Sequence, residues 1–400
     1  MSPPKKKVCF GEVANISEDS TSAEMDPNVA KNLVKEGATF VLLDVPPGTE
    51  IGVDMKSWNV GEKFLGIKMI PPGVHYVYYS SVNLAQKTVA PRTGFFHIFS
   101  RGEILIRRWR RDHEEVVDSV TEEDKERIKA DMKNLDRGLG VYPYQSWRKW
   151  ISLSDHITEA TLTRLEPVNK NICSVSDLIP VGAEGNHQEE DDSSSEPCLP
   201  KMMNRPGTNI RYTDVSTRKY PEGSSPAEIT RHSMDGSFQL TEFLTTLHRM
   251  YGDAVSSSMS DQNTINEVLA EIQFAFLCFL VGMNHDSFEQ WKRLVNMICM
   301  CDAKMVEQPD MFSKFLNVLY FQMQHVPTDF FVDIVSSNNF LCGSLNTLFT
   351  NGRNNTDVSQ QLKLKLARFE SNVTKRFGWD FSQDLEDDAP IVVETNSNDE

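Results

Sequence analysis

Long apolar runs are missing from this 400-residue sequence, and its N-terminus has no apolar core of the kind that a signal peptide needs. A helix that crosses a membrane needs about 18 or more consecutive apolar residues. We therefore expect a soluble, intracellular protein that makes no membrane contact.

Cysteine is scarce and irregularly placed. The closest pair of the seven, Cys299 and Cys301, has one residue between its members, whereas zinc sites have two or more between paired ligands. An odd, scattered set predicts free thiols buried in a reducing compartment rather than a disulfide framework or a zinc site.

The familiar catalytic motifs are absent as well. The sequence contains no G-x-S-x-G, phosphate-binding loop, H-E-x-x-H or dinucleotide fingerprint. A β-fold metalloenzyme of the cupin type would need paired histidines near a glutamate, and His75, His97 and His113 are not so arranged. We expect these histidines to pack and hydrogen-bond among strands, and we predict no catalytic residue, cofactor or metal.

Basic residues are in the minority, with 41 Lys and Arg against 57 Asp and Glu and a net charge of −16. This balance disfavours nucleic-acid binding over a broad surface and favours a protein partner with basic patches. One basic run could still contact RNA, with an aromatic ring to stack a base. The alternative is a structural strand end, because alternation along a strand would divide the run between two faces. The run consists of Arg107, Arg108, Trp109, Arg110 and Arg111.

The most informative stretch is residues 66–80, which predicts a strand, a reversal and a second strand. Pro71 cannot donate to a strand ladder, and Gly73 has the backbone freedom that a reversal needs. Residues 74–79 are β-branched or aromatic at nearly every position, which predicts a central strand of a sandwich with both faces covered.

Further β signals surround this stretch and predict an antiparallel sandwich or barrel. Strands are expected at residues 39–44 and 50–54, after a short helix at 27–36. Residues 94–100 and 103–109 read as a hairpin, because the two-residue link Arg101-Gly102 suits a primed turn.

Helices follow the β region. A helix is predicted at residues 121–139, and an apolar cluster of Trp147, Trp150 and Ile151 then leads to a helix that Ser154 caps and that runs to about Leu165.

The second half of the chain is predicted to be entirely helical. Capping boxes at residues 225–228 and 264–267 open two helices, and the second, running to Val281, is so apolar that we expect it to form the core. The remaining helices are predicted at residues 288–304, 312–324, 329–335, 340–349 and 357–377.

An acidic, serine-rich stretch separates the two halves, and its composition predicts a disordered linker. Its serines lie among carboxylates and are candidates for an acidophilic kinase: Ser193, Ser194 and Ser195. The predicted organisation is a disordered tail (1–24), a β-rich domain with flanking helices (25–172), a linker (173–208), an α-helical domain (209–378) and an extended tail (379–400).

Several motifs in order along the chain resemble the A1-cistron-splicing factor family, whose members are assembly factors of the U5 small nuclear ribonucleoprotein. They include residues 36–54, residues 66–80, Pro91-Arg-Thr-Gly-Phe-Phe96, Tyr142-Pro-Tyr144, Gln273-Phe-Ala-Phe276, Trp291-Lys-Arg-Leu294 and Trp379-Asp-Phe381.

This resemblance implies that the helical domain is an α-horseshoe or adaptor-like superhelix. It also implies a non-enzymatic, monomeric assembly factor of the cytoplasm and nucleus. The implied partner is the large U5 scaffold protein, bound at its RNase-H-like and endonuclease-like domains, so that docking of the U5 helicase is delayed. A helical trafficking adaptor and, less in keeping with the motifs, a β-fold metalloenzyme are the alternatives.

The C-terminal tail is the expected partner-binding element. Residues 391–393 have strand character but are too short to be stable alone, so we expect them to add to a sheet of the partner. The predicted partner-binding residues are Trp379, Asp380, Phe381, Ile391, Val392 and Val393.

Overall fold

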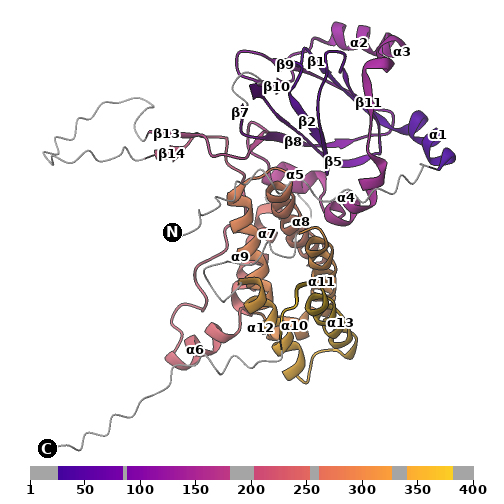
Figure 1. Ribbon diagram of the computed structural model, residues 1–400. Coiled ribbons are helices and arrows are strands. Elements are labelled where there is room, and N and C mark those ends of the chain that lie inside the picture. The colour runs from indigo at the N-terminus through magenta and orange to yellow at the C-terminus, as the bar shows by residue number, and fades with distance from the viewer. Residues whose placement is uncertain (1–25, 84–87, 181–201, 253–260, 327–339, 382–400) are drawn as a thin grey trace, which may run out of the picture.

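Figure 1 shows the computed structural model, in which a β-rich first part stands on a helical second part. The structure describes residues 26–83, 88–180, 202–252, 261–326 and 340–381. The tail at 1–24, the linker serines, the helix predicted at 329–335 and the strand-like residues 391–393 lie outside these ranges. The architecture is the two-domain α+β arrangement that the sequence predicted.

Two five-stranded sheets form the first domain. One has the order β10 (Glu115–Val117), β9 (Ile104–Arg110), β1 (Ala38–Leu43), β4 (Gly66–Ile70) and β11 (Leu139–Val141). The other has the order β12 (Ile172–Cys173), β8 (Thr93–Phe99), β5 (Gly73–Ser80), β2 (Glu50–Val53) and β3 (Lys56–Asn59). Pairing is antiparallel except that β1 runs parallel to β9 and β4 to β11. A short ribbon of β6 (Val82–Asn83) and β7 (Thr88–Val89) lies beside them.

Strand β5 is the centre of its sheet, and both of its faces are covered, as predicted. Val77 and Tyr79 belong to the core between the sheets. Tyr76 and Tyr78 point the other way and belong to the core that the sheet shares with the helices. This alternation places one strand in contact with both domains.

The predicted hairpin at residues 94–109 is wrong. The turn is present, with Gly102 at a φ of +65°, but β8 pairs with β5 and β12 whereas β9 pairs with β1 and β10. The link therefore crosses from one sheet to the other. A turn motif fixes a chain reversal, whereas the choice of neighbour depends on burial, and Phe99 and Trp109 are both buried between the sheets.

Five helices accompany the sandwich, and α1 (Pro27–Glu36) lies where predicted. The helix predicted at 121–139 instead breaks at Asp131 into α2 (Glu122–Ala130), α3 (Met132–Leu135) and a single 3-10 turn. Its expected last residue, Leu139, begins β11 and pairs with Gly66. The edge of β4 that faces away from β1 supplies backbone hydrogen bonds to residues 139–141. Helical periodicity within residues 121–139 cannot predict this distant partner.

The predicted role of Ser154 as a helix cap is also wrong. Helix α4 (Trp147–Ser154) ends at this residue, and the Ser154 hydroxyl donates to the Trp150 carbonyl at 2.9 Å. The following helix, α5 (Glu159–Leu165), is capped by Thr158, whose hydroxyl accepts from the Thr161 backbone N–H.

In the second domain the described helices are α6 (Pro226–Met234), α7 (Ser237–Gly252), α8 (Asp261–Leu280), α9 (His285–Cys299), α10 (Ala303–Glu307), α11 (Pro309–Gln324), α12 (Phe340–Asn354) and α13 (Gln360–Phe377). The capping box of α6 is confirmed, since Ser225 and Glu228 bond reciprocally. Residues 264–267 are not a cap, because α8 already extends from Asp261, and the Glu267 side chain contacts the first domain instead.

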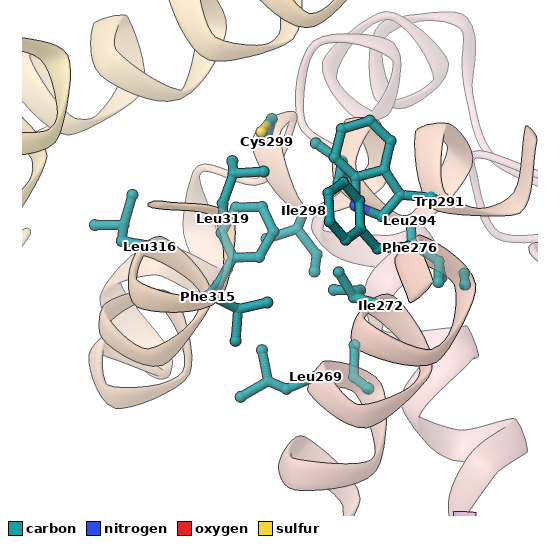
Figure 2. Packing of buried hydrophobic residues seen from close by; sticks show 14 of the residues in the cluster. Leu269, Ile272, Phe276, Trp291, Leu294, Ile298, Cys299, Phe315, Leu316 and Leu319 are labelled. Carbon is teal, nitrogen blue, oxygen red and sulfur yellow. The ribbon is translucent and has the colours of Figure 1, made fainter. Parts of the chain in front are cut away.

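Helix α8 is the core of the helical domain, as predicted. Figure 2 shows Leu269, Ile272 and Phe276 of α8 packed among side chains of α9 and α11. The side chains that surround them include Trp291, Leu294, Ile298, Phe315 and Leu319. Almost every described residue of α8 is buried, so the helix has partners on all sides.

The described ends of the predicted linker are ordered strands. Cys173 is the second residue of β12, and β13 (Leu178–Pro180) pairs antiparallel with β14 (Met202–Asn204). This two-stranded arm projects from the junction of the two domains (Figure 1).

Candidate interaction surfaces and two buried polar clusters

A buried cluster of Asp54, His75 and Tyr142 lies inside the sandwich. Asp54 occupies the β2–β3 turn at a φ of +56°, a conformation that aspartate tolerates better than most residues. His75 Nδ1 lies 2.7 Å from Asp54 Oδ2, and His75 Nε2 lies 2.8 Å from the Pro71 carbonyl oxygen. Both ring nitrogens of His75 therefore have a hydrogen-bonding partner inside the sandwich.

Two further donors complete the cluster. The Tyr142 hydroxyl donates to Asp54 Oδ2 at 2.6 Å, and the Tyr76 backbone N–H donates to Oδ1 at 3.0 Å. Burial, and after it the Asp54 charge, raises the pKa of Tyr142 well above its usual range, so this hydroxyl stays protonated. The side chains of Asp54 and His75 are 0% and 1% exposed. An acid–base pair so enclosed cannot reach a substrate, and its role is to hold the β2–β3 turn against β5 and β11.

A second cluster joins the two domains at Glu271, a fully buried residue of α8. Arg164 of α5 donates from Nη1 to Glu271 Oε2 at 2.6 Å. The backbone N–H and hydroxyl of Thr213 donate to the two oxygens at 2.9 and 2.8 Å, and Gln290 Nε2 donates to Oε1 at 3.1 Å. One carboxylate thus binds an arginine of the first domain, the segment between the domains and helix α9.

Other polar residues of α8 extend this seam. Thr161 of α5 donates to both oxygens of Glu267, at 3.1 and 3.0 Å. Gln273 accepts from the His156 backbone N–H at 2.8 Å and donates to Asp155 Oδ1 at 2.6 Å. Because these bonds are directional, they fix the register of the domains and not just their proximity.

Apolar contacts reinforce the seam. Trp150 of α4 is fully buried, shares one hydrophobic core with the helical domain and donates from Nε1 to the Val74 carbonyl at 2.6 Å. Phe96 of β8 packs against Phe274 of α8 with ring centroids 5.0 Å apart. Of the apolar cluster expected at residues 147–151, Trp150 lies at the domain boundary, whereas Trp147 packs against the sandwich core and Ile151 remains 37% exposed.

The seam residues were missed by sequence reasoning. Glu267 and Glu271 are spaced four apart in a helix that is otherwise almost wholly apolar. Acidic residues are rarely buried unless they are paired, so a carboxylate in the middle of a fully buried helix indicates a partner cation. That signal was present in the sequence, but it does not identify Arg164.

The basic run at residues 107–111 has the arrangement of a structural strand. Trp109 is 3% exposed and packs edge-on against Tyr79, so it offers no face to a base. Arg107 is paired with Asp118, and Arg108 with Asp44 at 3.2 Å. Arg110 is paired with Glu115, and Arg111 is exposed beyond the end of β9.

The described start of the C-terminal tail lies against the helical domain. Phe381 is 3% exposed and packs edge-on against Phe349, and Trp379 stacks on Phe377 at 4.7 Å. Asp380 is exposed beside them. The predicted residues Ile391, Val392 and Val393, and the candidate phosphorylation sites, lie outside the described residues.

Two further kinds of feature are absent from the described residues. No three metal-ligating side chains there are grouped to hold an ion. Among the helices described, none combines the length and apolar character of a membrane span.

The fold defines a two-domain α+β protein, a β-sandwich joined to a helical domain through a buried seam of polar and apolar contacts. The N-terminal domain model of AAR2 matches residues 36–167, and the AAR2 C-terminal repeat region matches residues 212–382. The chain therefore belongs to the AAR2 family.

Individual relatives match this chain over most of its length. The human protein AAR2 homolog is 42% identical over 388 residues, covering 93% of this chain and 97% of the relative. The Caenorhabditis elegans homolog is 35% identical, covering 90% of this chain and 99% of the relative. A yeast relative from Saccharomyces cerevisiae, named A1 cistron-splicing factor AAR2, is 22% identical, covering 73% of this chain and 78% of the relative.

Proposed function

We propose that this protein is a non-enzymatic assembly factor of the U5 small nuclear ribonucleoprotein in pre-mRNA splicing. The observation that carries the proposal is the family match across both domains, together with the splicing role in the name of the yeast relative. The Asp54–His75 pair is closed to solvent, which supports a structural role for these two side chains.

The proposed partner is the large scaffold protein of the U5 particle, bound at its RNase-H-like and endonuclease-like domains while helicase docking is delayed. A rigid seam suits such a role, because a preorganised surface loses less entropy on binding. The protein would act as a monomer, and its working compartments would be the cytoplasm and the nucleus.

Affinity capture of the full chain followed by mass spectrometry tests the proposal. We expect U5 proteins, with the scaffold protein the most abundant. Recovery of vesicle-coat proteins without spliceosomal ones would instead support a helical trafficking adaptor and overturn the proposal. A capture with unrelated chains of similar negative charge controls for nonspecific binding of basic proteins.

The tail from residue 382 onward is the proposed binding element, with Ile391-Val-Val393 adding to the edge of the partner's sheet. Because Phe381 is buried, a truncation that tests this idea has to keep it and end at Ser382. We expect that variant to unfold at the wild-type temperature in circular dichroism while losing about tenfold or more in partner affinity. Equal affinity of the two chains would reject the tail as a binding element.

Phosphorylation of the linker is proposed to tune the same interaction. Each phosphate on Ser193, Ser194 or Ser195 would add about −1.5 to −2 charges beside a basic partner surface. A titration of the scaffold protein with triple Ser→Ala and triple Ser→Glu variants is the test, and identical affinities would leave the linker as a spacer.

A further inference from the structure

One surface of this acidic protein has the opposite charge. Helices α4, α11 and α13 lie along the same side of the molecule (Figure 1) and together carry eight Lys and Arg against two acidic residues. Over the whole chain acidic residues outnumber basic ones, 57 to 41. The local excess of cations is therefore opposite to the overall composition.

Hydrogen bonds fix how α11 and α13 lie together. Lys365 Nζ donates to the Ser313 hydroxyl, and Arg376 Nη2 donates to the carbonyl oxygens of Gln324 and Val326, at 3.0 and 3.1 Å. The two helices are therefore parallel neighbours. Lys365, Arg368 and Arg376 fall on one face of α13 at helical spacing, beside the exposed face of α11.

Helix α4 supplies cations from the other side of α11. Burial first, and then the nearby charges of Lys149 and Arg376, lowers the pKa of His325 to about 4. Helix α4 packs against α11, and Arg376 donates to the carbonyls of Gln324 and Val326, so Lys149 of the first domain and Arg376 of the second both lie near the end of α11. Lys314 lies in the N-terminal half of α11, and its Nζ donates to Asn266 Oδ1 of α8 at 3.0 Å.

An exposed aromatic ring lies between these flanks. Phe321 is 40% exposed. It follows Lys314 by seven residues, or about two helical turns, and therefore lies on the same face of α11. We call the surface made by Lys149, Lys314, Phe321, Lys365, Arg368 and Arg376 the basic strip.

The strip's cations form no ion pair with the described carboxylates near them, including Asp310, which lies one turn before Lys314 on the same face of α11. Within the described chain, none of these five cations forms an ion pair within 4.0 Å. Glu370 of α13 is paired with Arg353, and Asp155 accepts a hydrogen bond from Gln273. Asp310 lies in the first turn of α11, where an acidic residue favours the helix dipole.

We propose that the basic strip docks an acidic segment of a partner protein, with one apolar side chain of that segment seated on Phe321. Cations on both sides of a central ring match a peptide whose carboxylates flank a hydrophobic anchor. Single-stranded RNA fits less well, because such sites stack successive bases on successive aromatic rings and the strip exposes one.

The strip is composite, since Lys149 belongs to the first domain and the other members to the second. It exists in this form because the seam holds the domains in register. The inference concerns the chemistry of a partner segment and is independent of the proposed role in splicing.

Fluorescence anisotropy with the full chain tests the proposal. The probe is a labelled twelve-residue peptide of glutamates with one central phenylalanine. Comparison probes are the same peptide with Phe→Ser, a lysine version and a twelve-nucleotide oligouridine. We expect the Phe-containing acidic peptide to bind tightest, and its affinity to fall about tenfold between 50 and 300 mM salt.

The key variant is Lys149→Glu with Lys365→Glu and Arg368→Glu, which should lose about tenfold or more in affinity. The matched control reverses three exposed lysines outside the strip, has the same net charge and should change affinity by less than about twofold. It consists of Lys31→Glu, Lys133→Glu and Lys219→Glu. Circular dichroism melts check both folds, and the corresponding Gln variants replace any that melt early.

Three outcomes would overturn the inference. Equal losses in the key and control variants would mean nonspecific charge attraction. Tighter binding of oligouridine than of the acidic peptide would assign the strip to nucleic acid. At least tenfold tighter peptide binding by a chain that ends at Ser382 would assign the strip to the protein's own tail. Phe321→Ala should erase the advantage of the Phe-containing peptide over its Ser version.

Discussion

The seam between the two domains gives the sharpest prediction. Replacing Arg164 with alanine removes the cation that faces Glu271 and leaves a fully buried carboxylate without its charge partner. Thr213 and Gln290 still donate to that carboxylate. The remaining donors limit the loss but do not replace a positive charge.

The expected magnitude follows from this arrangement. Breaking a buried ion pair by removing one partner costs about 3–5 kcal/mol. We expect Arg164→Ala to lie near the lower end, about 3 kcal/mol in the free energy of unfolding, because three hydrogen bonds to Glu271 persist. Glu271→Ala should cost more, about 5 kcal/mol, because Arg164, Thr213 and Gln290 each lose the hydrogen bonds that they donate to its carboxylate, and Arg164 loses its nearer charge partner.

Urea denaturation followed by circular dichroism measures both changes. The double variant should be less destabilised than the sum of the single variants by about 1–3 kcal/mol, as expected for residues in one network. The control is Arg205→Ala, which breaks an exposed ion pair with Asp177 and should cost less than about 1 kcal/mol. A loss below about 1 kcal/mol for Arg164→Ala would refute the reasoning that this pair holds the domains together.

Three further predictions concern single buried side chains. Burial raises the pKa of Glu166 to about 7, against 4.5 in an unfolded chain, so the folded state holds the extra proton and stability falls as pH rises from 4.5 to 7, by at most about 3 kcal/mol. Glu166→Gln should flatten that decline in urea melts at pH 5 and pH 7.5, and an unchanged slope would contradict the assignment. Asp54→Asn should destabilise the chain by about 2–3 kcal/mol, because an amide nitrogen in place of one carboxylate oxygen can no longer accept the hydrogen bonds made there, and a wild-type melting temperature would show the cluster to be dispensable. Phe381→Ala should cost about 3 kcal/mol, while Asp380→Ala beside it, an exposed residue, should cost much less, and equal costs would mean that Phe381 does not pack as the structure shows.

The sequence by itself determined the two-domain α+β architecture and those elements whose signals are carried by their own residues. Residues 74–79 are apolar or aromatic on both faces, and a strand of that kind has to lie between two layers, as β5 does. Helix α8 was predictable as the core for the same reason, because a helix that is apolar all round has to be buried. The capping box at Ser225 and Glu228 places the start of α6, since its hydrogen bonds are made within four residues.

Only the tertiary structure decided which elements became neighbours. The turn at Gly102 reverses the chain in either topology, so the assignment of β8 and β9 to different sheets depends on distant partners. The pairing of Arg164 with Glu271 joins residues 107 positions apart. The basic strip likewise forms from three helices separated along the chain, because charge adds up over a surface and not along a sequence.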